Sequence, residues 1–131
     1  MVESVRPFLM FEGRAQEAMD FYTSLFEDGA VLEASRYGPE GPGAEGSIVV
    51  ARFRVAGQEV MCSDSPVKHA FTFTPSMSLF VTCDSEAELR RLAGALDAGE
   101  AVLMPIDNYG FSRLFAWVAD RFGVSWQLNL P

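Results

Sequence analysis

The sequence is poor in histidine and in basic residues, and it lacks long apolar runs. Its single histidine, His69, cannot supply the pair of imidazoles that many metal and catalytic sites need. A formal charge of −8 repels phosphate backbones, so we expect no nucleic-acid partner. No stretch reaches the roughly 18 apolar residues of a membrane-spanning helix, so we expect no membrane partner either.

Cysteine is also scarce. Cys62 and Cys83 lie within strand-like segments, so we expect buried free thiols, with a disulfide as the alternative. Residues 1–4 lack the basic and apolar regions of a secretory signal. With 131 residues and 49% hydrophobic content, the chain can bury the core of one domain, and we expect a cytoplasmic protein.

The sequence contains the same pattern of helix and strands twice. Predicted helices at Ala15–Phe26 and Glu86–Leu96 each carry apolar residues at positions i, i+3, i+4 and i+7. A shift of 71 residues superimposes the two stripes, which are Ala18, Phe21, Tyr22 and Leu25, and Leu89, Leu92, Ala93 and Leu96. Two copies of one module packed side by side would share a cleft, and a cleft is where we expect the function.

Each predicted helix has one strand before it and three after it. The expected strands are Arg6–Phe11, Val31–Tyr37, Ser47–Val55 and Gln58–Ser63, then Met77–Thr82, Ala101–Met104, Ser112–Ala119 and Val124–Leu130. Pro105 is expected to interrupt the second copy, and Asp64–Pro75 to link the copies. The predicted fold is a single α+β domain of two βαβββ modules, about residues 5–65 and 75–131, in a curved mixed sheet around a cleft.

The closing strand of each copy alternates in polarity. Val124, Trp126 and Leu128 should lie under the helix, which leaves Ser125, Gln127 and Asn129 for the cleft. A shift of 66 residues maps this polar triplet onto Glu59, Met61 and Ser63. We therefore expect a ligand pocket lined by Gln127, Met61, Met77, Ser63 and Ser125.

Five segments carry a family resemblance that spans nearly the whole chain. They are Arg6–Gly13, Met19–Tyr22, Ser35–Gly38, Gly57–Met61 and, with the highest specificity, Asp120–Gln127. Together they resemble the PhnB-like branch of the vicinal-oxygen-chelate superfamily, the glyoxalase, bleomycin-resistance and extradiol-dioxygenase group. The resemblance implies paired βαβββ modules that form a U-shaped sheet around a pocket, usually in a homodimer.

Metal-using members of that superfamily hold their ion on the first and last strands of each module. The approximate counterparts here are Pro7, Met61, Met77 and Gln127, of which only Gln127 has a side-chain oxygen. A neutral amide is a weak ligand for hard divalent ions, so we expect no cofactor and no tightly bound metal. The alternative is a metal-assisted isomerase, lyase or dioxygenase, in which a divalent ion polarises vicinal oxygens of the substrate.

Several single residues can each be interpreted in two ways. Glu59 is the candidate general base if an apolar cleft raises its pKa; otherwise it faces solvent or pairs with Arg52 or Arg54. His69 is a solvated loop residue, or it is a base or lone ligand on a loop that closes over the cleft. Gln127 contacts a ligand or makes a structural hydrogen bond, and Met61 and Met77 line the pocket or pack in the core.

The glycine-rich segment Gly38–Gly46 is interpreted as a hairpin loop. A phosphate-binding loop needs a helix directly after it, whereas a predicted strand follows here. The same feature argues against a methyltransferase that binds S-adenosylmethionine on a nucleotide-binding sheet.

The predicted function is binding or sequestration of a small, mostly apolar molecule, with catalysis left open. A third hypothesis is a scaffold whose cleft is filled by its own aromatic side chains, such as Phe8, Phe11, Phe80, Phe115 and Trp117. Open strand edges favour a homodimer.

Overall fold

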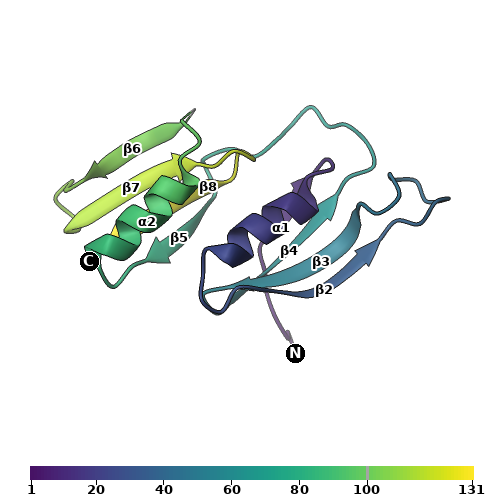
Figure 1. Cartoon of the computed structure of the whole chain (residues 1–131), viewed down its shortest axis with the longest axis horizontal. Helices are drawn as coiled ribbons and strands as arrows, with labels where there is room; N and C mark the ends of the chain where they lie inside the picture. The colour runs from purple at the N-terminus through teal and green to yellow at the C-terminus, as the bar shows by residue number, and fades with distance from the viewer. Residues whose placement is uncertain (100) are drawn as a thin grey trace. The chain divides into compact units, whose positions relative to one another are not determined.

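Each half of the chain pairs one helix with a four-stranded sheet (Figure 1). The computed structural model describes residues 1–99 and 101–131, and it divides the chain into the units Met1–His69 and Ala70–Pro131. The α+β class and the two βαβββ modules predicted from the sequence are confirmed. Among the described residues, no helix has the length and apolar content to span a bilayer.

The two units share one topology. Unit 1 contains β1 (Phe8–Phe11), α1 (Ala15–Ser24), β2 (Ala30–Arg36), β3 (Ile48–Val55) and β4 (Gln58–Asp64). Unit 2 contains β5 (Ser78–Thr82), α2 (Glu86–Leu96), β6 (Val102–Asp107), β7 (Leu114–Ala119) and β8 (Ser125–Leu130). The strand orders are β1-β4-β3-β2 and β5-β8-β7-β6, and in each sheet only the first pair is parallel. The closing strand of each copy therefore lies next to its first strand.

The helices bury the predicted stripes with one exception. In α2 all four predicted positions are buried. In α1, Phe21 is only half-buried, and Met19 is fully buried instead. The apolar face of α1 is thus rotated toward Met19 and Tyr22, because Tyr22 stacks on Phe53 of β3 with their ring centroids 6.1 Å apart.

The structure corrects two expectations about strands of unit 2. Pro105 lies inside β6 rather than ending it, because β6 is an edge strand whose outward side needs no N–H donor. The pairing of β6 with β7 instead shows two register shifts. Met77 precedes β5, which begins at Ser78, and its side chain is 66% exposed.

A buried carboxylate joins the elements of unit 1. The sequence places Asp64 in the linker, but in the structure it ends β4 and is only 4% exposed. Its Oδ1 accepts hydrogen bonds from the backbone N–H groups of Gly13 and Ala15 at 2.8 and 3.0 Å, and its Oδ2 accepts from Ile48 N at 2.9 Å. Asp64 thereby ties the beginning of α1 to β3 and β4, and it satisfies donors that a helix start leaves unpaired.

Asp120 has the corresponding role in unit 2. Its Oδ1 accepts from the backbone N–H groups of Phe122 and Val124, and its Oδ2 accepts from Trp126 Nε1 at 2.9 Å. The turn between β7 and β8 is therefore fixed to the largest side chain of the unit 2 core.

We expect Asp64→Asn to destabilise the protein by roughly 2–4 kcal/mol, because an amide replaces one acceptor with a donor that faces backbone N–H groups. Urea unfolding followed by circular dichroism measures the change. Asp20→Asn, on the exposed side of α1, is the matched control and should stay within about 0.5 kcal/mol of the parent. Equal stabilities for the two variants would contradict the structural role of Asp64.

Candidate functional site

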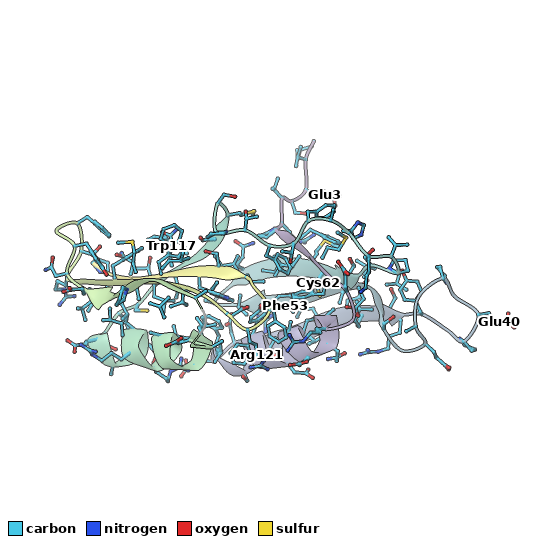
Figure 2. All side chains as sticks on the ribbon, turned by 90° about the horizontal axis from the view of Figure 1, so that it is seen from above. Glu3, Glu40, Phe53, Cys62, Trp117 and Arg121 are labelled. Carbon is cyan, nitrogen blue, oxygen red and sulfur yellow. The ribbon has the colours of Figure 1, made fainter. Side chains whose placement is uncertain are left out.

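The face of the unit 2 sheet that lies opposite α2 gathers side chains from three strands. The register of the strands places Ser78 and Phe80 of β5, Ser125 and Gln127 of β8, and Phe115 and Trp117 of β7 on this face. Figure 2 shows Trp117 on the side of its sheet away from α2. We call this surface the helix-free face of unit 2.

The polar alternation predicted for the closing strand is confirmed. Trp126 and Leu128 are fully buried on the α2 side of β8, whereas Gln127 and Asn129 are half-buried. Ser125 is 1% exposed, so its hydroxyl is enclosed rather than open to a ligand. Within this strand, Gln127 is therefore better placed than Ser125 to contact a ligand.

A chain of hydrogen bonds fixes the polar side chains of this face. Trp117 Nε1 donates to Ser125 Oγ at 2.8 Å, and Ser125 Oγ lies 2.7 Å from Ser78 Oγ. Gln127 Nε2 donates to Ser78 Oγ at 3.2 Å. The amide of Gln127 uses its nitrogen in this chain, and no described residue donates to its Oε1. An oriented amide oxygen is therefore left as a hydrogen-bond acceptor for a bound molecule.

Aromatic rings lie beside these polar groups. The Phe115 ring is only 4% exposed, and it contacts Phe80, Tyr109 and Phe111 at centroid distances of 6.4, 6.3 and 5.0 Å. Phe80 and Phe111 are 58% and 62% exposed. We call these four residues the aromatic cluster. Exposed rings next to an oriented polar group give a surface that suits an apolar molecule with one polar substituent.

The sequence pattern misses part of this surface. It predicts Phe80, Phe115 and Trp117 only as side chains that could fill a cleft, and it does not single out Ser78, Tyr109 or Phe111. The alternation of β5 could have identified Ser78. Tyr109 and Phe111 lie in the irregular segment between β6 and β7, where no periodicity exists to orient a side chain.

The face of the unit 1 sheet that lies opposite α1 carries different side chains from the helix-free face of unit 2. Met61 and Ser63 of β4 pair with Phe8 and Met10 of β1, and Phe8 is 52% exposed. Met61 and Ser63 are half-buried. That these residues and Gln127 line one shared cleft stays a prediction.

Glu59 does not have the raised pKa that a general base in an apolar cleft requires. Its Oε1 lies 2.7 Å from Arg52 Nη1 and 3.1 Å from Arg6 Nε. The hydrogen bond from Arg52, more than any other contact, lowers the pKa of Glu59 below its ordinary value. The second interpretation, an ion pair with Arg52, is confirmed, and the pair leaves this carboxylate a weaker base than a free glutamate.

Two further candidates, Met77 and His69, lie outside the regular strands. Met77 comes directly before β5 and is 66% exposed, and its place in the predicted pocket stays a prediction. His69 follows β4 in a segment without regular structure, and its Nε2 lies 2.7 Å from Ser65 Oγ. His69 is half-buried and anchored by that contact, not fully solvated.

The residues at the superfamily's metal-ligand positions do not fit a divalent ion. Pro7, Met61 and Met77 offer no side-chain oxygen or nitrogen, which leaves the single amide of Gln127. No group of three or more His, Cys, Asp or Glu side chains with metal-binding geometry occurs in the described part of the chain. Zn²⁺, Fe²⁺ and Mn²⁺ sites need several such donors at once.

Similarity to known proteins extends over almost the whole chain. A family model described as 3-demethylubiquinone-9 3-methyltransferase matches residues 3–129. The chain belongs to this PhnB-like family. A PhnB protein of Bacillus cereus with the same methyltransferase description is 51% identical, and the match covers 98% of this chain and all of that one, with a TM-score of 0.95. A Pseudomonas aeruginosa protein is 30% identical over 98% of both chains, with a TM-score of 0.84.

A more distant structure extends the likeness in fold. A glyoxylase/bleomycin resistance protein/dioxygenase domain from Frankia is 14% identical over 99% of this chain and 93% of its own, with a TM-score of 0.67. This PhnB-like chain thus shares the glyoxalase-like fold of that domain. Its segment Gly38–Gly46 joins the antiparallel neighbours β2 and β3, so the predicted hairpin loop is confirmed.

Both cysteines are free and buried, as predicted. Burial raises the pKa of the Cys62 thiol to about 12, and burial also raises the pKa of Cys83. Because the thiolate is the reactive form, we expect neither cysteine to react readily with Ellman's reagent at pH 8 in the folded protein. Two thiols per chain should react at once after unfolding in guanidinium chloride. Rapid reaction of Cys62 in the folded state would contradict its burial.

Proposed function

We propose that this PhnB-like protein binds a small, mostly apolar molecule on the helix-free face of unit 2, without a tightly held metal. It acts by binding or sequestration, as a cytoplasmic homodimer. The observation that carries the proposal is the combination of a partly exposed aromatic cluster with an oriented, unused amide oxygen on Gln127. The rings supply apolar contact area, and the amide selects molecules that present a donor at one edge.

The donor chemistry of the chain supports binding without a metal. The counterparts of the superfamily's ligand positions lack imidazoles and carboxylates, and Glu59 is engaged by two arginines. The family description names methyl transfer. A nucleotide cofactor is usually cradled by a glycine-rich loop that leads from a strand into a helix, whereas Gly38–Gly46 leads from β2 into β3. The glycine-rich loop of this chain therefore gives no support to methyl transfer from such a cofactor.

The small-molecule site can be tested with 2-naphthol, an aromatic probe with one hydroxyl donor. We expect 2-naphthol to shift the NMR signals of the Trp117 indole and Gln127 amide groups. Gln127→Met keeps the length of the side chain but removes the acceptor, so it should weaken binding by about fivefold, the effect of one hydrogen bond. Gln58→Met, at an exposed position in unit 1, is the matched control and should bind 2-naphthol as the parent does. No shift at millimolar probe, or equal affinity in both variants, would overturn the proposal.

Metal dependence is tested separately. Protein purified without chelator should contain no stoichiometric Ni, Zn, Mn or Fe by elemental analysis. Titration with each divalent ion should raise the melting temperature by less than about 1 °C, because an ion without a specific site gives no preferential stabilisation of the folded state. A stoichiometric ion, or stabilisation by several kcal/mol that Gln127→Met removes, would favour the metal-assisted alternative.

A further inference from the structure

A cavity lies on the helix side of unit 2. A groove of about 580 Å³ opens between α2 and the strands β6 and β7. Ala93 and Gly94 of α2 form one wall, and Val102, Met104, Ala116 and Val118 of the strands form the other. Arg90 and Asp97 lie at its rim. Its volume falls within the range of roughly 300–1,000 Å³ that is typical of small-molecule sites.

The repeat within the chain explains why this space is open. The strand registers make Phe53, opposite Val60, the counterpart of Val118, opposite Trp126. In unit 1 the space between helix and strand is filled by Tyr22 stacked on Phe53, which Figure 2 shows on the α1 side of its sheet. In unit 2 the equivalent pair is Ala93 and Val118. Two aromatic rings are thus replaced by a methyl group and an isopropyl group.

Gly94 extends the opening. A Cβ atom added at Gly94 would meet no heavy atom within 4 Å, so the groove reaches the helix backbone. Glycine lowers helix stability by about 1 kcal/mol relative to alanine, and packing does not require it at this position. The wall of the groove at Gly94 therefore has room for a larger side chain.

The charged side chains beside the groove indicate which kind of molecule it would bind. Arg90 donates from Nε to Glu86 Oε2 at 2.8 Å, and no described residue accepts a hydrogen bond from its two terminal nitrogens. The protein carries a net charge of −8, so an anion gains no general attraction and needs a local cation such as Arg90. Asp97 lies at the other end of the α2 side, where its carboxylate would repel an anionic group. An occupant would therefore place its anionic group near Arg90.

The edge of β6 argues against an extended peptide as the occupant. Pro105 removes a backbone donor, and the two register shifts with β7 twist the edge out of a regular ladder. A strand added at this edge would have few regular hydrogen bonds. A compact molecule that fills the apolar walls does not depend on the edge.

We propose that this groove is a second ligand site, for a small amphiphilic anion whose apolar body lies between α2 and β6–β7 and whose carboxylate or sulfonate pairs with Arg90. It lies on the opposite face of the sheet from Gln127 and does not depend on the function proposed above.

Two fluorescent probes with the same aromatic body test the site. They are 1-anilinonaphthalene-8-sulfonate, which carries the anion, and N-phenyl-1-naphthylamine, which does not. Gly94→Leu fills the groove and should weaken binding of both probes by at least about tenfold, because the leucine takes the space of the ring system. Ala95→Leu, on the next position of α2 and outside the groove, should leave both affinities within about twofold. Arg90→Gln should weaken only the sulfonate, by about threefold, as expected for an exposed ion pair.

Methyl NMR on the unmodified protein provides a readout that does not depend on how the variants fold. The sulfonate probe should shift the methyl signals of Ala93, Met104 and Val118, whereas the aromatic ring signals of Phe80 on the other face, recorded on the same sample, should change little. Shifts confined to the aromatic cluster, or equal binding by Gly94→Leu and Ala95→Leu, would overturn the proposal. A change of oligomeric state in Gly94→Leu, measured by light scattering, would assign the groove to a second copy of the chain and overturn it as well.

Discussion

One helix must cover one face of each four-stranded sheet, and this constraint decides where function can lie. A helix is about 10–12 Å wide with its side chains, whereas four strands span roughly 19 Å. One face of the sheet is therefore left without a helix, and the edge strand on the covered face is reached only by large side chains. Unit 1 fills the space between α1 and β3 with Tyr22 and Phe53, whereas unit 2 leaves a groove between α2 and the strands β6 and β7.

Two buried carboxylates stabilise this arrangement of one helix on each sheet. Asp64 and Asp120 each accept three hydrogen bonds, and each stands where a turn would otherwise leave backbone or indole N–H groups buried without acceptors. In a unit of about 60–70 residues the core is small, so each such group weighs heavily in the free energy of unfolding. The two aspartates thus occupy structural positions, and neither is free for catalysis.

The two units also differ in the side chains that their sheets carry. In unit 1 the carboxylate of Glu59 is engaged by ion pairs with Arg52 and Arg6. In unit 2 the helix-free face has uncharged polar groups and aromatic rings, and Gln127 keeps an unused acceptor. Such a surface recognises shape and one or two hydrogen bonds, which suits retention of a small molecule more than proton transfer.

The sequence by itself determined the repeat, the α+β class and the alternation of the closing strand, because these depend on periodicity along the chain. Gln127 could be assigned to the polar face of β8 on that basis alone. Only the tertiary structure decided that Met19 replaces Phe21 in the core, that Pro105 lies within an edge strand, and that Asp64 is buried. It also decided the environment of Glu59 and the placement of Tyr109 and Phe111, because both depend on residues that come together across strands and irregular segments, where no periodic pattern records the contact.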